Sequence, residues 1–270
     1  MIGPIRFGAL HAGSAFEVTE VTIASDRLPV GFDGFRLAVL ADLHMGRRVG
    51  PGFVRRVVEE VRGRRPDAAL LLGDMVERPE PYAHTFAELI APLAEHIPTY
   101  AVLGNHEYFG LSCVYRRCIR AAGVDLLVNE HRLIPCPGGP TDGGEPAIAL
   151  AGLDDLSDGR PSVRAAMEGI GRDTFSMLAV HHPDLVAHLP PNHSVDLVLA
   201  GHTHGGQVRL FGWTPLKITR DPTYLGGLVD GPGVPIYVSR GLGMTGLSLR
   251  IGADPELPII TLRSTKAVPG

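Results

Sequence analysis

The most regular feature of the chain is a series of short apolar runs, each ending at Gly, Asp, Asn or His. Several of their residues are β-branched, and turn-forming residues lie on both sides. Short apolar runs with these boundaries are typical of buried strands. The strands predicted in this way are residues 35–40, 68–72, 100–103, 125–128, 147–151, 176–180, 196–200, 207–210, 236–239 and 258–262.

Between the early strands the apolar positions recur with a helical period. Residues 53–64 carry valines at the i, i+3, i+4 and i+7 spacing of one helix face. Strands that alternate with helices favour βαβ units whose functional loops lie beyond the strand ends. After His204 only strands and turns are predicted, and we expect these later strands to complete a second sheet. The other predicted helices are residues 82–95, 114–122 and 163–170.

Length and composition favour one globular domain. The 270 residues are 44% hydrophobic and 20% charged, which is enough apolar material for a substantial core. The segment 135–146, rich in Pro and Gly, predicts a surface loop, and neither it nor the turn at 232–235 resembles a linker. We expect a single domain over residues 1–270, with a core from about 35 to 262 and residues 1–34 as an extension packed on it.

Charge and cysteine content exclude several classes of protein. A net charge of −4 offers no excess of positive charge for nucleic acid. Three cysteines without CxxC spacing argue against a disulfide framework and against a thiolate zinc site. No apolar run is long enough for a transmembrane helix, and residues 1–13 lack the features of a signal peptide. We expect a cytoplasmic protein and leave open both peripheral membrane contact and the oligomeric state.

Side chains that commonly bind metals gather after five of the predicted strands. In extended backbone, residues two apart point the same way, so Asp42 and His44 could reach one ion while Leu43 faces the core. One such cluster is weak, because a strand-end Asp is usually a cap or turn residue. Five of them in an α/β order predict a metal site, since strand ends converge on a shared crevice. The clusters are Asp42-Leu43-His44, Gly73-Asp74, Gly104-Asn105-His106-Glu107, His181-His182 and Gly201-His202-Thr203-His204.

This ordered set of motifs resembles the calcineurin-like metallophosphoesterase superfamily over about residues 35–262. The chain is most similar to the YkuE-type bacterial branch of membrane-linked phosphodiesterases. The resemblance implies an α/β fold, a four-layer α-β-β-α sandwich with two central mixed sheets flanked by helices. The segments that carry the finer match are 28–29, 34–36, 104–109, 202–209 (HTHGGQVR), 239–243 (SRGLG) and 255–256.

The resemblance also implies two divalent metal ions bridged by Asp74. Imidazole, carboxylate and amide ligands suit Mn, Fe or Zn, and the resemblance puts Mn first. Two such ions make hydroxide available from a bridging water and clamp phosphoryl oxygens, so hydrolysis needs no covalent nucleophile. The expected substrate bond is a phosphodiester or a pyrophosphate. The implied ligands are Asp42, His44, Asp74 and His204 for one ion, and Asp74, Asn105, His181 and His202 for the other.

Two histidines have roles that the resemblance only partly defines. His106 is expected to face the substrate and donate a proton to the leaving oxygen. The alternative is that His106 only contacts the metal ligands and does not reach the substrate. His181 is preferred to His182 as a ligand because the family has His, one residue and then Pro, which Pro183 fixes here. His182 is a departure, since related proteins often have Asn at this position.

Two further residues keep alternative roles. Asp155 could orient a ligand imidazole or serve in a turn. Arg240 could bind a substrate phosphate, although a structural salt bridge is slightly favoured. The sequence does not decide between the two roles of either residue.

Three functions compete. The favoured one is a phosphoesterase acting on a lipid- or envelope-related substrate such as UDP-2,3-diacylglucosamine, by analogy with the branch. Loops 211–213 and 224–228 could then contact a membrane through exposed apolar side chains. The second is a cytosolic phosphodiesterase of free or cyclic nucleotides. The third is a non-catalytic scaffold, which the complete set of expected ligands argues against.

Overall fold

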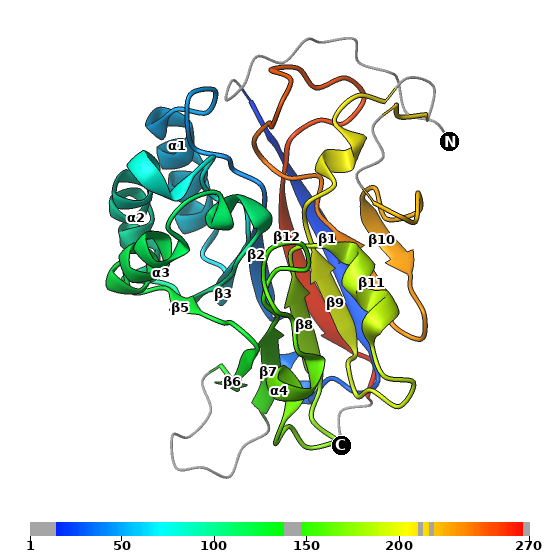
Figure 1. The fold of residues 1–270 in the computed structure, drawn as a ribbon. Coiled ribbons are helices and arrows are strands. Elements are labelled where there is room, and N and C mark those ends of the chain that lie inside the picture. Colours follow the sequence, from blue (N-terminus) through cyan, green and yellow to red (C-terminus); the bar gives the residue numbers. More distant parts are fainter. Residues whose placement is uncertain (1–14, 138–146, 210–212, 216–218, 267–270) are drawn as a thin grey trace.

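Two six-stranded sheets lie face to face between outer helices in the computed structural model (Figure 1). The structure describes residues 15–137, 147–209, 213–215 and 219–266. The helices gather on the outer side of the first sheet, and shorter helices lie outside the second. The predicted four-layer α-β-β-α sandwich is therefore confirmed.

The first sheet has the strand order β1-β12-β2-β3-β4-β5. Strands β2 to β5 are parallel to one another, whereas β12 runs antiparallel to β2 and parallel to β1. Parallel order places the carboxyl ends of β2, β3 and β4 at one edge of the sheet. The strands are β1 (Glu17–Ser25), β2 (Arg36–Leu40), β3 (Ala68–Leu72), β4 (Thr99–Val102), β5 (Asp125–Leu126) and β12 (Glu256–Ser264).

The second sheet has the order β10-β11-β9-β8-β7-β6. Its four central strands are parallel, and the edge strands β10 and β6 run antiparallel to their neighbours. The carboxyl ends of β7, β8 and β9 therefore also share one edge. The strands are β6 (Glu130–Pro135), β7 (Ala147–Gly152), β8 (Ser176–Val180), β9 (Leu197–Ala200), β10 (Gly227–Asp230) and β11 (Pro235–Val238).

Three apolar layers hold the sandwich together. Leu70 and Leu72 of the first sheet pack between the sheets with Met177 and Leu199 of the second. The valine face of α1 is buried against the outer side of the first sheet together with α2 and α3. Short α4 and a 3₁₀ helix, η3, cover the outer side of the second sheet. The helices are α1 (Pro51–Arg64), α2 (Pro79–Ala94), α3 (Ser112–Ala121), α4 (Val163–Met167), η1 (Val30–Phe32), η2 (Asn105–Tyr108), η3 (Pro183–His188) and η4 (His204–Gly206).

The structure corrects several predicted elements. The strand predicted at 207–210 is wrong in its described part, because Gln207 has a φ of 51° and Val208 forms only one isolated bridge. Strands β1, β6 and β10 are edge strands that the apolar pattern missed. Strand β1 comes from the segment expected to be an extension and pairs along its whole length with β12. Within the described part of the chain, no helix combines the length and apolar character that crossing a membrane requires.

Candidate metal centre

The loops that follow β2, β3, β4, β8 and β9 meet at the shared edge of the two sheets. They bring together the six predicted Asp and His ligands and His106, and Asn105 follows β4 on the same side of the sheet. Most of these side chains are buried, which is unusual for charged and polar groups. Among the described residues, four overlapping groups of three Asp or His side chains have ligand atoms within 4.8 Å of one another.

The backbone turns sharply at the cluster. Asp42, His44, Asp74, His202 and His204 all have positive φ, between 48° and 70°. The left-handed conformation costs a residue other than glycine about 1–2 kcal/mol, and such strain collects at functional sites. We predicted that extended backbone would point Asp42 and His44 the same way, and this is wrong because the backbone at both residues is left-handed. Both side chains nevertheless enter the cluster.

Two glycines allow the loops of the first sheet to approach the cluster closely. A Cβ atom at Gly73 would lie 2.5 Å from the backbone nitrogen of Gly104 and 2.8 Å from Nδ1 of His181. A Cβ atom at Gly104 would lie 2.3 Å from Oδ1 of Asp74. The Gly-Asp and Gly-Asn pairs of the sequence are thus needed for packing of the loops against each other.

One half of the cluster joins Asp42, His44, Asp74 and His204. The Nε2 atoms of His44 and His204 are 3.0 Å apart. Nε2 of His44 lies 3.5 Å from Oδ2 of Asp74, and Nε2 of His204 lies 3.6 Å from Oδ1 of Asp42. Two imidazole nitrogens and two carboxylates therefore face one small volume.

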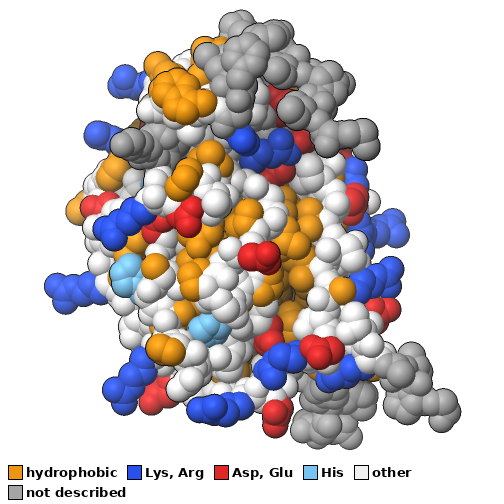
Figure 2. Space-filling view, turned by 90° about the vertical axis from the view of Figure 1, so that its right-hand side faces the viewer, with side chains coloured by type: hydrophobic (Ala, Val, Ile, Leu, Met, Phe, Trp, Pro, Cys, Tyr) orange, Lys and Arg blue, Asp and Glu red, His pale blue; other side chains and the backbone are white. Residues whose placement is uncertain are grey.

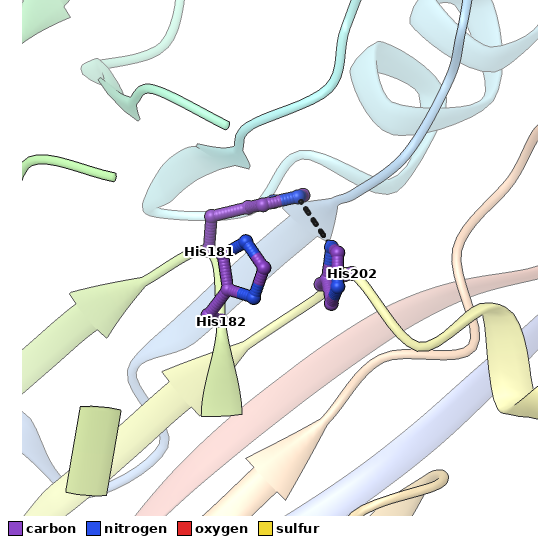
Figure 3. A group of neighbouring side chains, drawn as sticks. All are labelled: His181, His182 and His202. Carbon is purple, nitrogen blue, oxygen red and sulfur yellow. Dashed lines mark hydrogen bonds between the residues drawn. The ribbon is translucent and has the colours of Figure 1, made fainter. Parts of the chain in front are cut away.

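The other half joins Asp74 to His181 and His202. Nε2 of His181 lies 3.4 Å from Oδ2 of Asp74 and 3.2 Å from Nδ1 of His202 (Figure 3). Nδ1 of His181 lies 2.8 Å from the carbonyl oxygen of Leu72. A carbonyl only accepts, so Nδ1 carries the hydrogen when the ring is neutral, and Nε2 keeps a lone pair toward the cluster.

Asn105 provides a test of whether this set of residues fits a metal. Its Oδ1 atom is buried and has no hydrogen-bond partner in the described structure. Buried polar atoms are nearly always paired, and an unpaired amide oxygen is a group that a hard cation can bind. Asn105 directly follows Gly104, whose backbone lies against Asp74. The donor set therefore fits a divalent metal.

Electrostatics lead to the same conclusion. Burial raises the pKa of the Asp42 carboxyl to about 7. Burial by itself lowers the pKa of His181, but the carboxylates of Asp74 and Asp42 outweigh it and raise the pKa to about 10. Burial lowers the pKa of His44 to about 3 and that of His202 to about 2, so both rings are neutral near pH 7. Buried carboxylates beside neutral imidazoles are a set that a cation stabilises.

His106 lies at the exposed side of the cluster. Its side chain is 14% exposed, and Nε2 is 3.9 Å from Oδ2 of Asp74. Nδ1 lies 3.0 Å from the carbonyl oxygen of Glu77, which leaves Nε2 directed toward the site. The ring contacts His44 on one side and Phe109 on the other, with centroids 4.4 and 4.5 Å away. His106 therefore occupies a place from which it can reach a substrate.

Glu107 is a structural residue to which the sequence motif assigned no role. Its side chain is fully buried, and Oε2 accepts hydrogen bonds from the backbone N–H groups of Asp74 and Gly104, both at 2.8 Å. Oε1 accepts from the N–H groups of Met75 and Val76. One carboxylate thus ties the loop after β3 to the loop after β4. The only feature of the sequence that could have indicated this role is the charged residue that ends the Gly-Asn-His-Glu motif.

His182 packs on His202 and belongs to the same corner of the site (Figure 3). Their ring centroids are 3.6 Å apart, and Nε2 of His182 lies 3.1 Å from Oγ of Ser157. Oδ2 of Asp155 is 3.4 Å from the same nitrogen, while its Oδ1 accepts from the backbone N–H groups of Ser157 and Asp158. Asp155 therefore forms a turn and also faces an imidazole, that of His182.

Arg240 lies outside the cluster. Its guanidinium donates to Oε2 of Glu256 from Nε at 2.9 Å and from Nη2 at 2.6 Å, and it also contacts Glu17. These bonds join β1 and β12 to the turn after β11. The salt bridge that the sequence favoured slightly is therefore present.

Comparison with known proteins places the chain in a family. The calcineurin-like phosphoesterase family model matches residues 35–206. The uncharacterized metallophosphoesterase YkuE of Bacillus subtilis is 34% identical over 281 residues, which cover 98% of this chain and 96% of YkuE. The chain therefore belongs to the calcineurin-like phosphoesterase family. It is a metal-dependent phosphoesterase, similar over nearly its whole length to the YkuE-type branch, as the sequence predicted.

Some other relatives are longer. A zebrafish transmembrane protein with a metallophosphoesterase domain is 28% identical over 95% of this chain, and the chain spans 60% of that protein. Among solved structures, a 5′-nucleotidase precursor from Thermus thermophilus matches 85% of this chain and 54% of its own, with a TM-score of 0.49 and 14% identity. A dimetal phosphatase from Danio rerio matches 77% of this chain and 88% of its own, with a TM-score of 0.46 and 15% identity.

Proposed function

We propose that this chain hydrolyses a phosphodiester or pyrophosphate bond with the help of two divalent cations, manganese being the first choice and iron or zinc the alternatives. The central place of Asp74 carries this proposal. One of its oxygens, Oδ2, lies 3.5 Å from Nε2 of His44 and 3.4 Å from Nε2 of His181. A carboxylate between two groups of imidazoles supports a bridging ligand. The two proposed ligand sets are Asp42, His44, Asp74 and His204, and Asp74, Asn105, His181 and His202.

Two such ions, when bound, activate water and neutralise charge on the phosphoryl oxygens. The residues of the chain hold this arrangement in place. His181 is fixed by the carbonyl oxygen of Leu72, and Asp74 is fixed by the contact of its Oδ1 with the backbone N–H of His106. His106 can carry a proton on Nε2 while Nδ1 donates to Glu77, so we assign it proton donation to the leaving oxygen.

A lipid- or envelope-related substrate, of the kind that UDP-2,3-diacylglucosamine represents, is our proposal for the substrate class. Exposed apolar side chains support it. Phe109, beside His106, is 43% exposed, and Leu111, two residues further on, is 61% exposed. Trp213, on one of the two predicted membrane loops, is 65% exposed. Residues 211 and 212 of that loop lie outside the described residues.

The second predicted membrane loop is supported only in part. Tyr224 and Leu225 are buried, whereas Leu228 on β10 is 50% exposed. Hydrophobic side chains gather in the middle of the face on the side of β10 and β11, and charged side chains surround them (Figure 2). Exposed apolar surface of this kind supports peripheral contact with a lipid surface. Cys113 is an exposed free cysteine, which supports a reducing compartment such as the cytoplasm.

A substrate panel tests this proposal. Metal-free protein is assayed with and without Mn²⁺ on bis(p-nitrophenyl) phosphate, a lipid-linked nucleoside diphosphate and cyclic nucleotides. We expect no hydrolysis without metal, and faster hydrolysis of the lipid-linked pyrophosphate than of cyclic nucleotides. Preference for cyclic nucleotides would favour the cytosolic nucleotide phosphodiesterase. Failure of every added metal to restore hydrolysis to the metal-free protein would contradict the metal-dependent mechanism itself.

A further inference from the structure

Phe109 is an exposed aromatic residue next to the proposed proton donor, His106. The two ring centroids are 4.5 Å apart, and the ring planes make an angle of 43°. The side chain of His106 is 14% exposed, whereas Phe109 is 43% exposed. The preceding residue, Tyr108, packs instead against the apolar core beneath the helices. Phe109 is therefore the outer neighbour of His106, on the side that faces solvent.

The turn that carries Phe109 is held in place on both sides. The N–H of Phe109 donates to the carbonyl oxygen of His106 at 3.1 Å. Gly110 has a φ of 143°, and a Cβ atom there would lie 2.7 Å from Oε2 of Glu80 on α2. The same carboxylate oxygen accepts from the N–H of Leu111 at 3.4 Å. The turn thus presents Phe109 beside His106 and a second apolar residue, Leu111, two positions further on.

The exposure of this turn is informative because of its place. Single exposed apolar residues are common on protein surfaces and need no explanation. Here Phe109 and Leu111, 43% and 61% exposed, lie in one short turn beside a cluster built from Asp and His. An apolar ligand that covers such side chains is stabilised, because both partners lose contact with water. The turn therefore offers apolar contact at the edge of a polar site.

The position of His106 indicates which part of a substrate meets Phe109. A proton donor must come within about 2.6–3.2 Å of the oxygen that it protonates, and here that oxygen belongs to the leaving group. The substituent on this oxygen is then one bond further away and within reach of the Phe109 ring. The aliphatic side chain of Leu111 cannot stack on a nucleobase, so the pair of residues favours an alkyl or acyl chain.

We infer that Phe109 is a specificity-determining residue, whose ring contacts an alkyl or acyl chain on the leaving group while Leu111 extends the contact. The inference rests on the proposed function, in which His106 protonates the leaving oxygen. Water supplies the hydroxyl group that stays on phosphorus, and the bond from phosphorus to the leaving oxygen breaks. His106 gives the released oxygen its proton, and the proton that the water loses restores His106.

Alkyl esters of uridine 5′-monophosphate (UMP), from methyl to octyl, test the inference on the Mn²⁺-loaded protein. Loss of the alkyl side yields UMP and an alcohol, whereas loss of the nucleoside yields uridine and an alkyl phosphate. We expect UMP and the alcohol. Each methylene group that leaves water contributes about fourfold. Coverage of two or three of them by the turn should raise kcat/KM about 10–100-fold from methyl to octyl, at concentrations below micelle formation.

Variants of the turn show whether Phe109 causes this rise. Phe109→Ser should reduce the rise to about threefold or less, while kcat/KM for the methyl ester stays within about twofold of the wild type. Phe109→Leu should keep most of the rise, because leucine is also apolar. Leu133→Ser is the control: Leu133 is 58% exposed on β6, where it pairs with Ala149, and its loss should change neither ester.

Three results would overturn the inference. The first is a wild type whose kcat/KM does not depend on chain length, and the second is formation of uridine and alkyl phosphate. The third is an equal loss for methyl and octyl esters in Phe109→Ser, which would mean that the ring acts through His106. Failure of the wild type to hydrolyse any phosphodiester would instead overturn the proposed function.

Two further measurements keep the test valid. Circular dichroism shows whether Phe109→Ser is folded; if it is not, Leu111→Ser takes its place and should also reduce the rise from methyl to octyl. An ester that binds without being cleaved still reports the contact as a competitive inhibitor of aryl phosphodiester hydrolysis. Its inhibition constant should then fall about 10–100-fold from methyl to octyl, and no fall would count against the contact.

Discussion

Asp74 is the residue on which the two halves of the cluster depend. Its Oδ2 faces imidazoles of both halves, and its Oδ1 accepts from the backbone N–H of His106. Burial alone raises the pKa of Asp74, but His181, His44 and His106 outweigh it and hold the pKa well below its ordinary value. The side chain is therefore an anion near neutral pH, as its proposed role as a bridging ligand requires.

Asp74→Asn should abolish binding of both cations and nearly all activity. The amide removes the negative charge and turns one oxygen into a nitrogen that carries hydrogen and has no lone pair for a cation. Elemental analysis of the purified variant measures bound metal, and hydrolysis of an aryl phosphodiester measures activity. A variant that keeps two tightly bound ions would show that Asp74 does not bridge them.

His106→Ala should retain metal but lower the turnover number by about 10²–10⁴-fold, because a positioned general acid contributes a factor of this size. The loss should shrink for substrates with good leaving groups such as p-nitrophenolate, which need no proton. Turnover measured over a series of leaving groups checks this. An equal loss for every leaving group would assign His106 to positioning the substrate.

Protonation of Asp42 and His181 makes metal affinity depend on pH. Both have a raised pKa in the metal-free fold, about 7 and about 10, and each must lose its proton to bind a cation. Affinity for the cation that His181 holds should therefore fall by about tenfold per unit as pH falls from 8.5 to 7, because one proton is displaced. Affinity for the cation that Asp42 holds should fall in the same way only below about pH 7.

Calorimetry in buffers of different ionisation enthalpy counts the protons released when both cations bind. About one proton at pH 8 and about two at pH 6 are expected. Proton release that does not change between these two pH values would refute the role given to Asp42.

At the scale of elements, the strands and the loops differ in how far the sequence predicts them. Apolar runs predicted β2, β3, β8 and β9 closely, because central parallel strands are buried on both faces. Edge strands such as β1 alternate between exposed and half-buried positions, and charged residues such as Glu17 and Glu20 interrupt the apolar signal. The left-handed backbone at Asp42 and His44 gave no signal either, since these residue types are not confined to such turns.

Glu107 is the point where two loops are joined, and Glu107→Gln tests this. The carboxylate accepts four backbone N–H bonds, and an amide replaces one acceptor by a donor that would face an N–H group. The free energy of unfolding should fall by about 1–3 kcal/mol, the usual cost of a buried unsatisfied polar group. Denaturant unfolding of metal-free protein measures it.

The control for this prediction is Glu60→Gln. Glu60 pairs with Arg64 four residues later on α1, and the two side chains are 39% and 33% exposed. Exposed pairs of this kind contribute only about 0.3–0.5 kcal/mol, so the control should be nearly unchanged. Equal stability of the two variants would mean that Glu107 does not hold the loops together.

At the scale of the molecule, the sequence predicted the sandwich and the convergence of the clusters but not what holds the clusters in place. Ligand motifs are local, whereas the residues that support them are distant: the guanidinium of the buried Arg250 donates to the carbonyl oxygen of His204, which lies 46 residues away in the chain. From the sequence alone, a buried Arg or Glu is predicted to lie on the surface, because these residues are usually exposed. Glu107 and Arg250 were therefore recognisable only when the loops were assembled.

Because the proposed ligands come from both sheets, metal should stabilise the whole sandwich. Asp42, Asp74 and Asn105 follow strands of the first sheet, and His181 and His202 follow strands of the second. A ligand that binds only the folded state raises the free energy of unfolding by about 2.7 kcal/mol when its concentration is 100 times its Kd. Two cations at that concentration should each contribute about this amount. Denaturant unfolding with Mn²⁺ and with chelator measures the difference, and Asp74→Asn should show almost none. A gain of the same size in that variant would place the stabilising ions elsewhere on the protein.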